Sequence, residues 1–285
     1  MLTQDENDML TQVDAGTPMG ELFRRFWMPA MLAEEIPGAD CPPVRLKLLG
    51  EDLIAFRDTD GKPGVIDAYC PHRGAPLFFG RNEECGLRCV YHGWKFDVNG
   101  NCVDLPNSPE GETYKDKVNI AAYPAIDKGG IVWVYMGPKD LKPLFPAFKW
   151  TELPESHRFM QKLIINCNYF QSMEGDIDSS HVNFLHSVLG DVRSNPQVRH
   201  RDADPARLAG TVPQYVHVED TDYGVGHVTV VNRGDGTQMV NTGSWLMPCF
   251  TLGSAAVGVG QQNIRVPIDD EHTLHMGIEW HPSKP

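Results

Sequence analysis

Two short stretches of the sequence each place a cysteine close to a histidine. Cys70 and His72 lie in CPHRGA, and Cys89 and His92 lie in CVYHGW, with sixteen residues between the two pairs. A glycine follows each pair and lets the backbone fold closely around a buried centre. Two thiolates and two imidazoles could bind one tetrahedral zinc ion. They could also bind a two-iron, two-sulfur cluster, with both thiolates on one iron and both imidazoles on the other.

A second stretch, DIDSSHVNFLH at residues 176–186, contains Asp178, His181 and His186. A helix would place Asp178 and His181 on one face, because they are three residues apart. His181 and His186 are five apart, about 140° around an ideal helix, so they could bind one metal only through long side chains or a distorted helix. The alternative is a solvated helix with two ordinary histidines, in which Asp178 is an N-cap or a solvated carboxylate.

The elements that must position these residues begin with a helix and a series of short strands. Thr17 and Pro18 are typical of an N-cap and a first helical position, and the helix is expected to continue through MGELFRRFW and stop before Pro29. Strand patterns then recur in VRLKLLG, DLIAFRD, VIDAY and GIVWVYMG, and Asn99–Gly100 is typical of a hairpin tip. Residues 28–138 are therefore predicted to form a small all-β domain after a helical segment at 1–27.

The rest of the chain, residues 139–285, is predicted to form a second domain. It opens with the proline-rich linker PKDLKPLFPAF, and its first expected strand is RFMQKLIINC. A polar helix is expected from Tyr169 to His186, followed by antiparallel strands in QYVHVED, GVGHVTVVNR, GSWLMPCFTL, QNIRVPI and TLHMGIEWH. The fold class is thus α+β.

Composition excludes some partners and compartments. The 38 acidic and 25 basic residues give a formal net charge of −13, which disfavours nucleic acids and anionic membranes. The sequence has no apolar run long enough to cross a membrane, and its N-terminus lacks a secretory signal, so we expect a cytoplasmic protein. The seven cysteines suit metal ligation better than disulfides. The five outside the two pairs are expected to be packing residues, namely Cys41, Cys85, Cys102, Cys167 and Cys249.

The two cysteine–histidine pairs resemble the Rieske family motif, including the flanking residues Pro71, Arg73, Gly74, Tyr91, Gly93 and Trp94. The resemblance implies a [2Fe-2S] cluster bound by Cys70, His72, Cys89 and His92, and makes the zinc interpretation the weaker one. The loops lack the extra cysteines of the membrane-bound respiratory form, so they resemble the soluble type of oxygenases and ferredoxins. Neutral imidazole ligands raise the potential of such a cluster into the range of about −150 to +300 mV.

The D-x2-H-x4-H pattern resembles the mononuclear-iron motif of Rieske non-haem iron ring-hydroxylating oxygenases. From GTPMGELFRRFW onward, the chain is most similar to the phthalate 4,5-dioxygenase-like branch of this family. The resemblance implies that His181 and His186 bind iron together with a carboxylate. Asp178 would instead link an iron-binding histidine to a cluster histidine of the neighbouring subunit, in a head-to-tail homotrimer. It also implies a helix-grip catalytic domain, an antiparallel sheet curved around a long C-terminal helix.

The third iron ligand is not evident in the sequence. Four late carboxylates are available, at Asp269, Asp270, Glu271 and Glu279. VPIDDEHTLHMGIEW resembles a segment that precedes the third ligand in the family, and no long helical pattern follows SWLMPCF. We therefore expect the second domain to be incomplete, with the ligand beyond Pro285. The alternative is an iron bound by the two histidines and one of these four carboxylates.

The function implied is that of a terminal oxygenase. A flavin/iron–sulfur reductase or a ferredoxin would deliver electrons from NADH, and O2 would react with an aromatic carboxylate such as phthalate to give a cis-dihydrodiol. An aryl methyl ether O-demethylase is the alternative within the family. An electron-transfer module with two irons per chain, or a zinc-stabilised binding domain, would be the alternative from another class.

Overall fold

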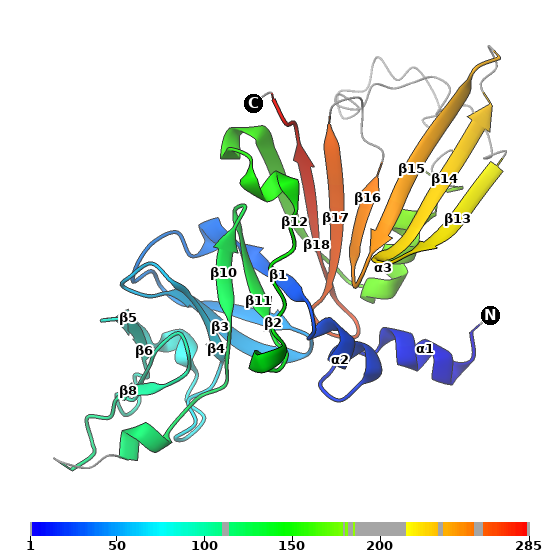
Figure 1. The fold of residues 1–285 in the computed structure, drawn as a ribbon. Coiled ribbons are helices and arrows are strands. Elements are labelled where there is room, and N and C mark those ends of the chain that lie inside the picture. Colours follow the sequence, from blue (N-terminus) through cyan, green and yellow to red (C-terminus); the bar gives the residue numbers. More distant parts are fainter. Residues whose placement is uncertain are drawn as a thin grey trace.

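The computed structural model describes residues 2–109, 114–178, 180, 181, 185, 215–232, 236–253 and 259–283. These residues form four antiparallel sheets and three α-helices (Figure 1). The mostly antiparallel architecture with few helices agrees with the predicted α+β class. Among the described residues, no helix has the length and apolar character needed to cross a membrane.

Two short helices open the chain. Helix α1 (Gln4–Thr11) begins at Thr3, whose hydroxyl accepts the Glu6 N–H, while Glu6 bonds back to the Thr3 N–H. Helix α2 (Pro18–Phe23) begins at Thr17 as predicted, but it ends several residues before Pro29. Strand β1 (Trp27–Leu32) replaces the expected last turn, because its apolar residues pair with the buried strand β11 (Ile131–Tyr135). The register shifts beside Pro29, where the missing N–H is tolerated.

Three small sheets build the region around the cysteine–histidine pairs. Their strand orders are β1-β11-β10, β2-β3-β4-β9 and β5-β6-β7-β8. The remaining strands of these sheets are β2 (Val44–Leu48), β3 (Glu51–Arg57), β4 (Pro63–Asp67), β5 (Arg81–Glu83), β6 (Gly86–Arg88), β7 (Lys95–Phe96), β8 (Cys102–Asp104), β9 (Ala122–Tyr123) and β10 (Ala125–Lys128). The predicted hairpin at Asn99–Gly100 joins β7 to β8, and Gly100 has a φ of 86°, which favours glycine.

A seven-stranded sheet follows, in the order β12-β18-β17-β16-β15-β14-β13. Its strands are β12 (Arg158–Ile165), β13 (Tyr215–Thr221), β14 (Gly224–Asn232), β15 (Gln238–Leu246), β16 (Phe250–Gly253), β17 (Gly260–Pro267) and β18 (Thr273–Trp280). The stretch predicted as one strand, GSWLMPCFTL, is a hairpin of β15 and β16, with Leu246 opposite Phe250. Pro248, after a cis peptide bond, lies in the turn because it has no N–H for the ladder.

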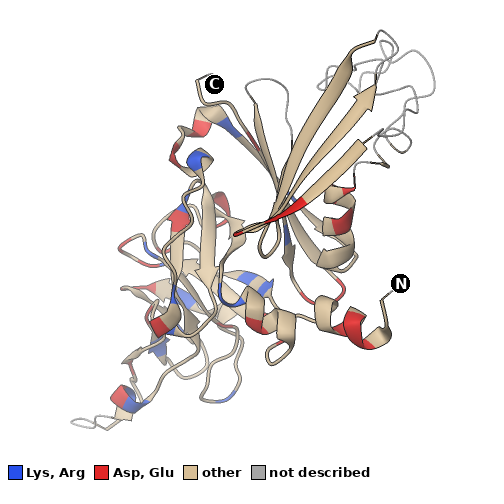
Figure 2. Ribbon diagram, turned by 45° about the vertical axis from the view of Figure 1, so that its right-hand side comes forward, with Lys and Arg blue, Asp and Glu red and all other residues tan. Residues whose placement is uncertain are grey.

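The two faces of this sheet have different partners. Ile264 and Val266 of β17 belong to a buried core that also contains Trp133 and Trp150, and Trp133 stacks over Phe250 at 6.4 Å. Helix α3 (Tyr169–Ile177) lies against β15–β18 on the opposite face (Figure 1). Charged residues are spread over the small sheets and the N-terminal helices but are sparse on the strands of the large sheet (Figure 2).

Candidate metal centres

The two cysteine–histidine loops share one backbone turn. In each, the N–H of the fifth residue donates to the cysteine carbonyl, and the cysteine N–H donates to the carbonyl of the sixth residue. The fifth residues, Gly74 and Gly93, have φ of 66° and 78°. This left-handed conformation favours glycine. The histidine is the third residue of the first loop and the fourth of the second, so identical turns present the two imidazoles differently.

The loops bring two buried thiols together. Cys70 and Cys89 are 2% and 3% exposed, and neither forms a disulfide. Burial raises the pKa of the Cys70 thiol to about 11, and the neighbouring Cys89 thiol adds to the shift. Two such buried groups become thiolates only when a cation compensates their charge. Their placement therefore suits metal ligation.

The two imidazoles lie beside each other at the same place. The ring centroids of His72 and His92 are 4.5 Å apart, with the planes at 62°. The Nδ1 atom of His72 is buried and has no hydrogen-bond partner among the described residues. A buried nitrogen of this kind is an unexplained polar group unless it binds an ion. Burial, followed by the charges of His92 and Arg73, lowers the pKa of His72, which keeps the ring in its neutral, metal-binding form. The donor set and its burial thus fit a [2Fe-2S] cluster.

Aromatic side chains surround this pair of imidazoles. The Trp94 indole stacks on His72, with centroids 4.4 Å apart and planes at 5°, and its Nε1–H donates to Asn107. The ring centroid of Tyr91 lies 3.9 Å from that of His92, and Tyr91 is 60% exposed. One imidazole is therefore covered by a buried indole, whereas the other has an exposed ring beside it.

The second stretch differs from the expected continuous helix. Helix α3 ends at Ile177, and Asp178 is extended, with φ −74° and ψ 112°. The carboxylate of Asp178 bridges the break. Its Oδ1 accepts the Ser180 N–H at 2.8 Å and the Ser180 hydroxyl at 2.6 Å, while its Oδ2 lies 3.2 Å from His181 Nδ1. The Leu185 N–H donates to the His181 carbonyl.

This geometry assigns Asp178 two local partners at once. The hydrogen bonds from Ser180, and then that from His181, lower the pKa of Asp178, so the group is a carboxylate at neutral pH. A carboxylate opposite Nδ1 favours the Nδ1–H tautomer of His181, in which the Nε2 lone pair could bind a metal. Asp178 can therefore cap the turn at Ser180 and contact His181 at the same time. His186 lies outside the described residues.

Two of the four late carboxylates have structural partners. Asp269 accepts hydrogen bonds from Lys47 at 2.8 Å and from His272 Nδ1 at 2.8 Å, within the turn between β17 and β18. The Asp270 carboxylate accepts the Val13 N–H at 2.8 Å and so ties the N-terminal segment to this turn. These contacts account for both carboxylates without a metal.

A buried ion pair lies beneath α3. Asp176, in the last turn of α3, accepts Arg265 Nε–H at 2.7 Å and Nη2–H at 2.5 Å. Thr251 and Asn263 add hydrogen bonds at 3.2 and 3.3 Å. The side chains of Asp176 and Arg265 are only 9% and 11% exposed. No local pattern indicates this pair, because its members are 89 residues apart.

Other polar groups share this sheet face. Burial, and then the charge of Arg265, lowers the pKa of His275 to about 4, so its ring is neutral at pH 7. Its Nε2 lies 3.4 Å from the Asn263 side-chain oxygen. On β15, the Trp245 indole N–H is buried without a partner among the described residues. Besides His72, His92, His181 and His186 the sequence contains seven histidines, and no pattern in it distinguishes His275 from the other six.

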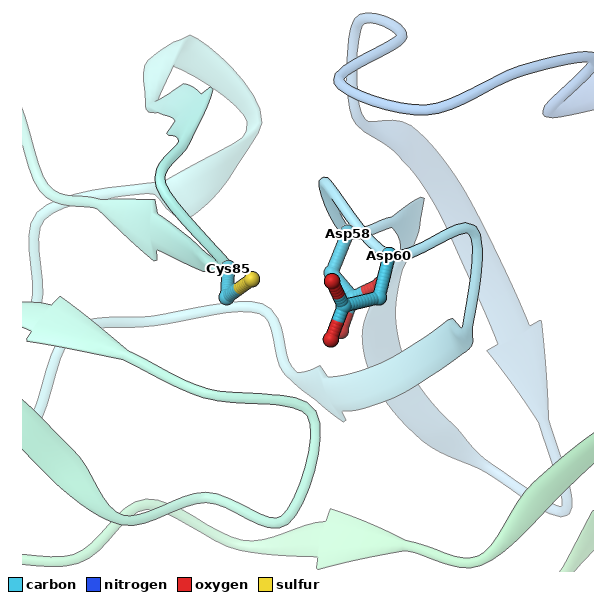
Figure 3. A group of neighbouring side chains, drawn as sticks. All are labelled: Asp58, Asp60 and Cys85. Atoms are coloured by element: carbon cyan, nitrogen blue, oxygen red, sulfur yellow. The ribbon is translucent and has the colours of Figure 1, made fainter.

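A third group of metal-type side chains comprises Asp58, Asp60 and Cys85 (Figure 3). Asp58 and Asp60 lie in the turn between β3 and β4, and Cys85 lies in the turn between β5 and β6. Asp58 accepts the Lys62 N–H at 2.8 Å, and the Lys62 ammonium lies 3.1 Å from Asp60. Hydrogen bonds within the turn therefore account for this cluster.

Comparison with known proteins agrees with this geometry. Residues 26–124 match the Rieske [2Fe-2S] domain, and residues 134–285 match the family described as LigXa C-terminal domain like. The chain is 39% identical to the phthalate 4,5-dioxygenase oxygenase subunit of Pseudomonas putida, over 98% of this chain and 64% of that protein. It is 41% identical to the 3-chlorobenzoate-3,4-dioxygenase oxygenase subunit of Comamonas testosteroni, over 99% of this chain and 64% of that protein.

A solved structure shows the same fold. Dicamba monooxygenase bound to 3,6-dichlorosalicylic acid superposes with a TM-score of 0.71 at 21% identity, over 91% of this chain and 78% of that one. The chain spans 64% of the length of both curated relatives. The two matched domains and the paired cysteine–histidine loops show that the chain belongs to the Rieske non-haem iron oxygenase family.

Proposed function

We propose that the chain acts as the terminal oxygenase component of a multicomponent system. One observation carries the proposal, namely the contact of Asp178 Oδ2 with His181 Nδ1 in a chain that also holds a complete Cys2His2 cluster site. A Rieske electron-transfer module needs only the cluster site. A carboxylate that orients an imidazole is instead typical of a second metal site.

The residues divide into two functional sets. Cys70, His72, Cys89 and His92 would hold the [2Fe-2S] cluster, and His181 and His186 would hold a mononuclear non-haem Fe(II). When bound, these groups supply one-electron transfer and dioxygen activation, respectively. Asp178 would orient His181 and accept its Nδ1–H. It would also connect this histidine to a cluster histidine of a neighbouring subunit in a homotrimer.

The substrate we propose is an aromatic carboxylate such as phthalate. Both curated relatives are oxygenase subunits of dioxygenases named for aromatic carboxylates. Cis-dihydroxylation consumes one O2, two electrons and two protons and adds both oxygen atoms to the ring. One NADH, oxidised by a flavin/iron–sulfur reductase or through a ferredoxin, supplies the two electrons. These electron donors and a cytoplasmic location are part of the proposal.

An aryl methyl ether O-demethylase is the second candidate. The fold of this chain is also that of a monooxygenase, dicamba monooxygenase. Such a reaction uses the same O2, electrons and protons but releases one oxygen atom as water. Pocket shape decides between the two outcomes.

Metal analysis and turnover of the purified holoenzyme with a reductase test the proposal. We expect three irons per chain in the complete protein, and O2-dependent products from a panel of aromatic acids and aryl methyl ethers. His181→Ala should retain two irons and the visible spectrum of the cluster but form no product. His217→Ala is the matched control, because His217 lies on β13 with its side chain 53% exposed.

Other outcomes identify the competing functions. Hydroxylation by the His181→Ala variant would disprove the iron assignment. Two irons per chain without oxygen-dependent product would indicate an electron-transfer module. A colourless protein that contains zinc would indicate a zinc-stabilised binding domain.

A further inference from the structure

The central strands of the large sheet carry a single charge. Strands β14, β15, β16 and β17 are described over their whole length, and Arg265 is the one charged residue among them. Its guanidinium is buried and is directed to Asp176 through two parallel hydrogen bonds. A bidentate pair of this kind fixes direction as well as distance. Arg265 therefore fixes the position of Asp176 on α3.

Asp176 lies at the C-terminal end of α3, which is unfavourable for a negative charge. Asp176 is in the last turn of α3, where the helix dipole is negative and where the helix has no basic residue. A carboxylate at this position destabilises the helix end unless a cation from elsewhere compensates its charge. Arg265 supplies the charge, and Thr251 and Asn263 occupy further acceptor positions of the same carboxylate. Three side chains from two strands thus converge on one helical residue.

The proposed iron site begins directly beyond this contact. Asp178 follows Asp176 by two residues, and the chain leaves the helix there in an extended conformation. The Nδ1 atom of His181 lies beside the Asp178 carboxylate, which also closes the turn at Ser180. The direction in which α3 ends therefore sets the position of both groups.

We infer that Asp176 and Arg265 are a positioning pair, which fixes the end of α3 on β16 and β17 so that Asp178 and His181 point to the metal. The inference rests on the proposed function, because it assigns the pair a role only toward that metal site. The competing explanation is that the pair merely stabilises the fold. Stability alone does not require charges here, since a buried ion pair can often be replaced by apolar residues of similar volume without loss.

That replacement provides the test. Asp176→Asn leaves Arg265 buried without its counterion, so the protein should lose both stability and positioning. The double variant Asp176→Leu, Arg265→Met removes both charges and should restore the thermal midpoint, but it cannot restore the direction set by the fork. Glu35→Gln is the matched control. It breaks the partly buried ion pair of Glu35 with Lys162 on β12 of the same sheet, away from α3.

Four quantities are measured on the holoenzyme: thermal midpoint, iron per chain, the rate of iron loss to a chelator, and the single-turnover rate of cluster reoxidation by O2. In the double variant we expect iron loss and reoxidation to change about ten- to a hundredfold, with a normal cluster spectrum, because small misplacements cost this much. Amide hydrogen exchange in protein depleted of mononuclear iron should be faster across residues 170–178. Glu35→Gln should change none of these except the midpoint.

The outcomes separate this inference from the proposed function. A double variant with wild-type iron retention, reoxidation and exchange would overturn the inference while leaving the oxygenase proposal intact. If Asp176→Asn does not fold, the double variant still decides. A complete wild-type protein with only two irons per chain would contradict the proposed function, and the inference with it.

Discussion

The imidazole of His72 and the indole of Trp94 stack with centroids 4.4 Å apart and planes within 5°. The indole is 8% exposed and covers one side of the cluster site. We expect Trp94→Ala to admit water and shorten the lifetime of the cluster in air several-fold, measured by the decay of its visible absorbance. Trp94→Phe keeps an aromatic ring in the stack and should retain most of that lifetime. An alanine variant as durable as wild type would show that the stack does not protect the cluster.

The two loop glycines offer a matched comparison. Both have positive φ, so alanine at either position is strained by roughly 1–2 kcal/mol. A Cβ on Gly93 would also lie 2.7 Å from Pro106 Cγ, whereas a Cβ on Gly74 would have no heavy atom within 4 Å. We therefore expect Gly93→Ala to lose distinctly more cluster than Gly74→Ala, measured as iron and absorbance per chain after purification. Equal loss would mean that φ strain alone governs both sites.

Asp178→Asn should separate the two tasks of this side chain. The asparagine oxygen can still accept the hydrogen bonds from Ser180, but its NH2 group would face the Nδ1–H of His181, and two donors repel. We expect an intact cluster spectrum and a mononuclear iron affinity weakened about 10–100-fold, measured by competition with a chelator. Asp178→Ala also removes the cap and should in addition lower the thermal midpoint. Wild-type iron affinity in the asparagine variant would exclude an orienting role for the carboxylate.

His275 makes the large sheet sensitive to acid. Its pKa is lowered to about 4 by burial and then by Arg265, against about 6.5 in an unfolded chain. Between these values the unfolded state binds more protons, so stability is complete above pH 6.5 and falls as the pH drops toward 4, by roughly 1–3 kcal/mol.

We expect His275→Gln to reduce the fall in thermal midpoint between pH 7.0 and 5.0, because glutamine does not titrate. His217→Gln, at an exposed position on β13, should leave the fall unchanged. An undiminished fall in the His275 variant would contradict the assigned titration.

Short-range rules were sufficient for much of the fold and for the cluster site. Thr17 and Pro18 indicated the start of α2, and Asn99–Gly100 indicated a hairpin, because caps and tight turns depend on neighbouring residues. The four candidate cluster ligands could be named for the same reason, since each loop is a self-contained turn with its cysteine and histidine at fixed spacing. The boundaries proposed at residues 27 and 138 stay a prediction.

Long-range contacts decided what the sequence alone left open or misplaced. Trp27 was predicted to be helical but lies in β1, because that strand pairs with β11. The helix expected to continue across Asp178 ends at Ile177. The sequence by itself determined which residue types could bind the cluster, and it singled out Asp178 and His181. Only the tertiary structure placed Arg265 against Asp176, 89 residues away, because the stability of a buried charge depends on which partner the fold brings into contact with it.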